Sequence, residues 1–206
     1  SDRVYTAFQN SSQQMKLMAQ FTTNSESIDE ARRAVNNAVA GSEDIVSFYA
    51  YLIDDKGVPN LVIQSFADTA ISEFGVNTED FRKRIEPTVF YKQYQKPGDF
   101  IVTNAAPFTG KAFYSLSFMS NRAEALAEKA TKHVYAQRWI FRAELRHSSI
   151  LRIFPKKSFS SSFLVSPEGK LLAHSRDEFA DYMMQDTSLS SSPIVEKMLS
   201  SSLNNH

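Results

Sequence analysis

The sequence predicts an α+β fold in which an N-terminal helical region packs against an antiparallel sheet. Residues 1–44 read as helix and come before any run of β-forming residues. From residue 45 onward, apolar and aromatic runs recur between turn residues, which is typical of strands. Two pairs of these runs have the pattern of hairpins, closed at Gly57 and Gly169, because glycine can adopt the positive φ that a tight turn needs.

The first helical segment, residues 1–23, carries a repeating apolar pattern. The polar Ser11 weakens the pattern. A homodimer through this helix and packing on a sheet of the same chain are both compatible with it. The positions recur at alternating steps of four and three, the spacing of a coiled-coil seam, and are Val4, Phe8, Ser11, Met15 and Met18.

A second helical segment follows, and the two together are predicted to form a helix of about 40 residues that bends near Asn24. Ser27 and Glu30 have the spacing of a capping box, in which the two residues satisfy backbone N–H groups at a helix start. Gly41 can end this segment.

The middle of the chain, residues 45–155, is predicted to contain five strands. A helix that starts at Thr78 and ends or kinks at Pro87 is expected between the second and third strands. A short apolar helix is expected after the fifth strand, over residues 148–154. The predicted strands are rich in β-branched and aromatic residues and span residues 45–53, 61–66, 99–108, 111–119 and 137–145.

The fourth and fifth predicted strands alternate in a way that assigns residues to faces, because successive side chains of a strand point to opposite sides. In the fourth, Tyr114, Leu116 and Phe118 share one face, and Ser115 and Ser117 the other. In the fifth, one face is expected to hold Trp139, Phe141, Ala143 and Leu145, and the other Arg138, Arg142 and Glu144.

The chain composition excludes several classes of protein. Lys and Arg together number 23, as do Asp and Glu, and this balance argues against a nucleic-acid-binding protein, which would normally be basic. Cysteine is absent, so the chain has no disulfide or thiolate chemistry. No apolar run reaches the length of a membrane span.

No pattern in the sequence predicts a catalytic, metal or cofactor site. The four histidines are scattered and lack the spacing of metal ligands. The serine-rich stretches lack the Gly-x-Ser-x-Gly context of a nucleophile, and no glycine-rich loop could hold a phosphate.

Four segments, taken in order, resemble a known family. They are FYAYLIDDKG, GDFIVTNAAPFTGKAFYSLSF, RWIFRAELRHSSILRIF and SSFLVSPEGKLLAHS. This succession is similar to a double-Cache domain, the PAS-like extracytoplasmic sensor of bacterial membrane receptors. The resemblance implies a long N-terminal helix packed on a PAS-like antiparallel sheet, followed by a partial second PAS-like module. It places the helical region at residues 1–44, a membrane-distal module at residues 45–155, and the start of an incomplete membrane-proximal module at residues 156–206.

The resemblance also implies a function. The chain would be the periplasmic ligand-sensing part of an inner-membrane signalling receptor, with an unknown small-molecule ligand. The tail SPIVEKMLSSSLNN is similar to sensor regions that precede adenylate or guanylate cyclase domains. A histidine kinase or a methyl-accepting chemotaxis protein is the alternative output. A soluble hydrolase and an interaction module without a small ligand are alternatives of other classes.

Ligand-binding candidates lie on the central strands and on the segment before them. Pockets for small molecules combine aromatic walls with a few polar groups. In this set Arg142 could hold a carboxylate through two parallel hydrogen bonds. Trp139 and Tyr114 could equally be core residues, and Arg142 a solvated one. The Arg-x-Trp-Tyr-type signature of amino-acid-binding relatives is missing, so an amino-acid ligand is not supported. The candidates are Tyr91, Tyr94, Thr103, Asn104, Tyr114, Ser117, Trp139 and Arg142.

Overall fold

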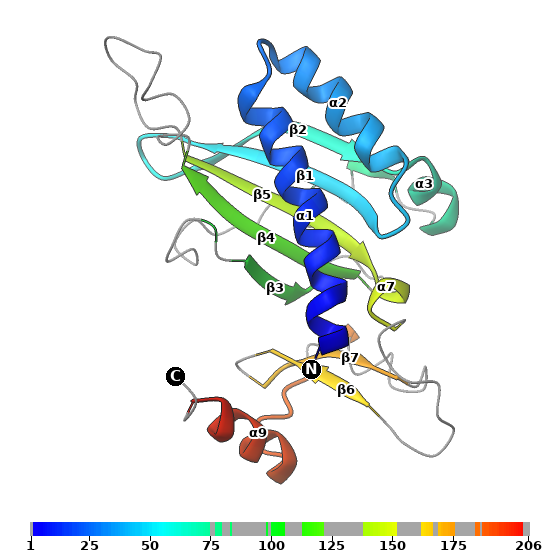
Figure 1. Ribbon diagram of the computed structural model, residues 1–206, viewed down its shortest axis with the longest axis vertical. Helices are drawn as coiled ribbons and strands as arrows, with labels where there is room; N and C mark the ends of the chain where they lie inside the picture. The colour runs from blue at the N-terminus through cyan, green and yellow to red at the C-terminus, as the bar shows by residue number, and fades with distance from the viewer. Residues whose placement is uncertain are drawn as a thin grey trace.

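The fold is α+β: two N-terminal helices pack on a five-stranded antiparallel sheet, and a small two-stranded sheet and a C-terminal helix follow (Figure 1). This confirms the predicted fold class and is consistent with a PAS-like fold. The computed structural model describes residues 2–74, 77–79, 83, 98, 100–105, 113–121, 138–151, 162–166, 169–175, 184–185 and 187–203.

The N-terminal region is two helices, not the single bent helix that the sequence predicts. Helix α1 (Asp2–Asn24) ends before a short turn, and α2 (Ile28–Ala40) folds back beside it (Figure 1). The Ser27 hydroxyl oxygen accepts a hydrogen bond from the Glu30 N–H at 3.2 Å, so the predicted cap is present. The Glu30 carboxylate accepts the Glu26 N–H at 3.1 Å. This cap starts a new helix in a new direction, because the Ncap residue has a non-helical backbone.

The second half of the apolar pattern of α1 packs inside the protein. Ser11, Met15 and Met18 are buried, and both methionines belong to the hydrophobic core. The side chains of Val4 and Phe8 lie outside the described part of the structure. A homodimer through this helix stays a prediction.

The main sheet has the strand order β2-β1-β5-β4-β3, and every neighbouring pair is antiparallel. Strands β1 and β5 are buried along almost their whole length. For β1, the nearly continuous apolar run at residues 45–53 indicates this burial. The strands span Ile45–Ile53 (β1), Pro59–Phe66 (β2), Phe100–Asn104 (β3), Phe113–Asn121 (β4) and Arg138–Arg146 (β5).

Two short helices adjoin the sheet. Helix α7 (His147–Leu151) follows β5 directly, close to its predicted position. Helix α3 (Asp68–Phe74) was not predicted from the sequence; its Thr69 hydroxyl accepts a hydrogen bond from Arg146 at 2.7 Å. Most of the helix predicted from Thr78 lies outside the described residues.

The C-terminal part begins with a hairpin of β6 (Phe163–Val165) and β7 (Leu171–His174), as predicted. Residues 187–189 pair with this hairpin, and the Leu171 N–H donates to the Thr187 carbonyl at 3.0 Å. Helix α9 (Pro193–Leu203) follows. Leu171, Leu172 and Ala173 of β7 belong to the same hydrophobic core as the main sheet. The predicted division into modules at residue 155 stays a prediction.

The main sheet has two unlike faces. On the face toward α1, large rings alternate with small side chains. The Lys16 ammonium of α1 lies 5.5 Å from the centre of the Phe100 ring, and Phe100 contacts Phe118, which contacts Phe141. We call this side the helix-covered face. Its other members include Phe48, Ala50, Tyr114, Trp139 and Ala143.

Candidate ligand-binding site

The opposite face of the main sheet carries a buried set of polar side chains. Arg142 on β5 is paired with Tyr49 on β1 and with Ser117 on β4. Glu144, two residues further on, is paired with Ser47 and Ser115. Residues directly opposite one another in an antiparallel pair point to the same side, so all six share one face. We call this side the polar face.

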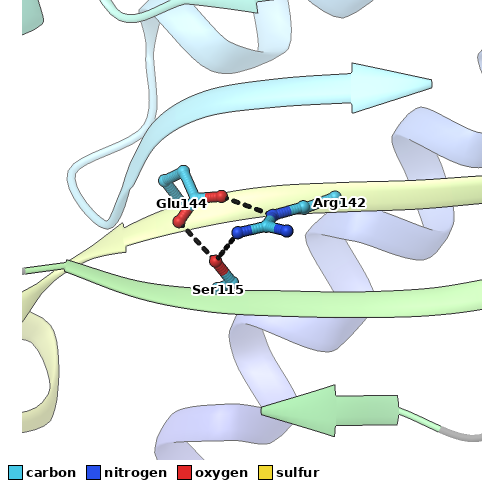
Figure 2. Close-up of polar contacts among 3 residues, drawn as sticks. All are labelled: Ser115, Arg142 and Glu144. Carbon is cyan, nitrogen blue, oxygen red and sulfur yellow. Dashed lines mark hydrogen bonds and ion pairs between the residues drawn. The ribbon is translucent and has the colours of Figure 1, made fainter. Parts of the chain in front are cut away.

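Three of these residues form a closed hydrogen-bonded unit, the Arg142 cluster, which consists of Ser115, Arg142 and Glu144 (Figure 2). Arg142 Nε donates to Glu144 Oε1 at 2.7 Å, and Arg142 Nη2 donates to Ser115 Oγ at 2.5 Å. Ser115 Oγ donates in turn to Glu144 Oε2 at 2.6 Å. Figure 2 shows the three side chains in front of β4 and β5, with α1 behind the strands.

The Arg142 cluster is a charge-balanced unit inside the protein. Arg142 is 3% exposed, Ser115 1% and Glu144 0%. Burying either charge alone would be strongly unfavourable, so the ion pair and its hydrogen bonds must compensate for the lost hydration. Both oxygens of Glu144 and the Nε–Nη2 side of Arg142 are used inside the cluster. Arg142 is therefore not the solvated residue that the sequence left as one alternative.

Two hydroxyl groups beside the cluster are buried without a hydrogen bond. Ser47 and Tyr49 are both 0% exposed, and neither Ser47 Oγ nor Tyr49 Oη has a partner with hydrogen-bond geometry within the described structure, although the Ser47 hydroxyl lies near enough to Tyr49 to lower its pKa. Most buried polar groups in proteins do have such a partner, so these two require an explanation.

The Tyr49 phenol is held in its neutral form. Burial raises its pKa well above the ordinary value of 10.0, with a smaller contribution in the same direction from the charge of Glu144. The nearby Ser47 hydroxyl and the charge of Arg142 oppose the shift but do not cancel it. The Tyr49 hydroxyl therefore keeps its proton and can donate it in a hydrogen bond.

The structure places the predicted site residues on two different faces. Ser117 and Arg142 lie on the polar face, and Thr103 is on the same side, opposite Ser115, but exposed. Asn104, Tyr114 and Trp139 lie on the helix-covered face. Tyr91 and Tyr94 lie outside the described residues.

Tyr114 has a partner that gives it a structural role. Its hydroxyl is 2.5 Å from His147 Nδ1, and the two rings stack with their centres 5.5 Å apart. Burial raises the pKa of Tyr114. The pair joins β4 to the start of α7. Trp139 stacks on Phe141 with ring centres 5.9 Å apart, which places it in the core as well.

Sequence reasoning missed Ser47, Tyr49, Ser115 and Glu144 as members of the site. Ser115 and Glu144 were assigned to the correct faces of their own strands, but the pairing of those strands was unknown. In β1 the nearly continuous apolar run hid the face of Tyr49. The available signal was the polar Ser47 two positions before Tyr49, because alternate residues of a strand lie on the same face.

Comparisons with known proteins give no match: no family model, curated protein or solved structure matches the chain. Among the described residues, no group of three or more His, Asp or Glu side chains is arranged to hold a metal ion. Within the same residues, no helix is long and apolar enough to cross a membrane.

Proposed function

We propose that the chain is the extracytoplasmic ligand-sensing domain of a bacterial transmembrane signalling receptor. The observation that carries the proposal is the pair of unpartnered, fully buried hydroxyls of Ser47 and Tyr49 beside the Arg142 cluster. A ligand that hydrogen-bonds to them would satisfy groups that the described protein leaves unsatisfied. The PAS-like α+β fold supports the same function by fold-level analogy.

Strand β5 offers a direct route from such a ligand to the N-terminal helix. Arg142 and Glu144 lie on the polar face, while Phe141 and Ala143 between and beside them lie on the face that α1 covers. A ligand that binds one arrangement of β5 and α1 better than another shifts the population toward it. We propose that the parent receptor is anchored in the inner membrane, dimerises, and passes this shift to a cytoplasmic adenylate or guanylate cyclase. A histidine kinase or chemotaxis output remains the alternative.

A thermal-shift screen of the purified chain tests ligand binding. The screen contains carboxylates, amines and nucleobases, each as a single compound. A ligand at a concentration of 100 times its Kd stabilises the folded state by about 2.7 kcal/mol. For a chain of this size, that raises the melting temperature by roughly 5–11 °C. Absence of any shift would favour an interaction module without a small ligand, and turnover of ester substrates would favour the hydrolase.

A second experiment tests the receptor itself. A compound that stabilises the isolated chain should change the output of the full-length receptor in cells, and it should act from the periplasmic side. A Tyr49→Phe receptor should respond at least tenfold less to the same compound. An unchanged output in the presence of a saturating, stabilising compound would contradict the sensor function while leaving ligand binding intact.

A further inference from the structure

The unpartnered groups of the polar face differ from other unsatisfied groups in the protein. Ser65 Oγ and Trp139 Nε1 also lack a hydrogen bond among the described residues, but they lie on the helix-covered face among apolar side chains. Ser47 and Tyr49 lie two residues apart on one strand and opposite the two charged residues of the Arg142 cluster. Two neighbouring hydroxyls next to a fixed ion pair make a site with a defined chemistry.

The charge of this site is already balanced. Arg142 Nε lies 2.7 Å from Glu144 Oε1, and both side chains are buried. A group further away therefore meets little net charge. An anionic ligand would lose its hydration and face the Glu144 carboxylate, while Arg142 is already engaged with that carboxylate. A cationic ligand would meet the reverse problem. An uncharged ligand avoids both penalties.

Both groups beside the ion pair are hydroxyls, which can donate a hydrogen bond. The Ser47 and Tyr49 hydroxyls each carry a proton, and the phenol of Tyr49 is kept protonated by its burial. Each hydroxyl oxygen can also accept a hydrogen bond, but only an acceptor on the ligand satisfies the buried O–H groups, so the ligand must present at least one accepting atom. Carbonyl oxygens and ring nitrogens do so without carrying a charge.

We propose that the polar face binds an uncharged small molecule that presents a carbonyl oxygen or a ring nitrogen to the hydroxyls of Tyr49 and Ser47. This inference rests on the proposed sensing function and names the chemical class of its ligand. Arg142 and Glu144 act as positioning residues, because they hold Ser115 and the strands around the two hydroxyls.

Matched pairs of neutral and anionic probes test the inference. Nicotinamide and nicotinate, benzamide and benzoate, and uracil and orotate differ in each pair by a carboxylate. We expect at least one neutral probe to raise the melting temperature of the wild-type chain, and its anionic partner to bind at least tenfold more weakly. Tyr49→Phe should weaken binding of the neutral probe at least tenfold, and Ser47→Ala should weaken it in the same direction.

Tyr114→Phe serves as the matched control, since Tyr114 is equally buried but lies on the helix-covered face. Its affinity for the neutral probe should equal that of the wild type. Without any probe, Tyr49→Phe should melt no lower than the wild type, whereas Tyr114→Phe should melt lower. A Tyr49→Phe chain that loses as much thermal stability as Tyr114→Phe would show that the Tyr49 hydroxyl has a partner in the protein, and would overturn the inference.

The failure of the inference can be told apart from that of the sensing function. Tighter binding of an anionic probe, or binding of a neutral probe that Tyr49→Phe leaves unchanged, would overturn the ligand class while the sensor proposal stands. Absence of binding by every probe of the panel and by every compound of the wider screen would overturn both.

Discussion

The two faces of the main sheet are buried to a similar extent but bury different kinds of side chain. On the helix-covered face, Phe141 contacts both Phe48 and Phe118, and Ala50 and Ala143 are wholly buried on the same face. On the polar face, an ion pair and several hydroxyls are buried at the same depth. The first face stabilises the fold by removing apolar surface from water, whereas the second buries groups whose desolvation is unfavourable. Depth of burial alone therefore does not separate the core of this protein from its candidate site.

The largest expected effect comes from breaking the Arg142 cluster. Glu144→Ala would leave the Arg142 guanidinium buried without its carboxylate, and we expect it to lower the free energy of unfolding by about 3–5 kcal/mol. Denaturant unfolding followed by circular dichroism measures this loss. Asp29→Ala is the control, because the Asp29–Arg32 pair has a similar distance of 2.9 Å but lies on the surface. Its loss should be barely measurable, and equal losses in the two variants would contradict the account of the polar face.

The helix-covered face should be sensitive to size instead of charge. Ala143→Leu inserts three heavy atoms into a wholly buried position beneath the N-terminal helices. We expect overpacking to lower the free energy of unfolding by about 1–3 kcal/mol. The same denaturant measurement applies. A neutral or stabilising Ala143→Leu would show that this face is not closely packed.

The hydrogen-bonded tyrosine of the helix-covered face provides a smaller test. Tyr114→Phe removes the hydroxyl that is 2.5 Å from His147 Nδ1 and leaves that nitrogen without this partner. The expected loss is about 1–3 kcal/mol, toward the lower end because His147 is only partly buried. Unfolding of Tyr114→Phe at the wild-type denaturant midpoint would contradict the structural role given to the pair.

The buried tyrosines should also shape the stability of the protein at alkaline pH. Burial raises the pKa of both Tyr49 and Tyr114 above the unfolded value near 10.0. Above that value the unfolded chain loses these protons and the folded chain keeps them. Stability is therefore complete below pH 10 and falls above it, by about 1.4 kcal/mol per pH unit for each tyrosine. Tyr49→Phe should reduce this loss of stability by about 1.4 kcal/mol per pH unit, which is the contribution of one tyrosine. An unchanged pH dependence of stability would contradict the raised pKa of Tyr49.

Much of the fold could be predicted from alternation and turn residues, and the site could not. The faces of Tyr114, Phe141 and Arg142 within their own strands were readable, because polar and apolar residues alternate there. Alternation does not state which strands are neighbours, so it could not bring Ser115, or Ser47 from far earlier in the chain, to the ion pair of β5. The reversal at Ser27 was also missed, because a capping box marks where a helix starts but not the direction it takes.

The most direct test is the free energy of unfolding of the unliganded Tyr49→Phe chain, measured beside wild type and Tyr114→Phe. The central claim is that the Tyr49 hydroxyl is buried without a partner until a ligand supplies one. Removing an unsatisfied buried hydroxyl should leave stability unchanged or raise it by up to about 1–3 kcal/mol. A loss as large as that of Tyr114→Phe would mean that the hydroxyl is already satisfied within the protein, and would contradict the claim.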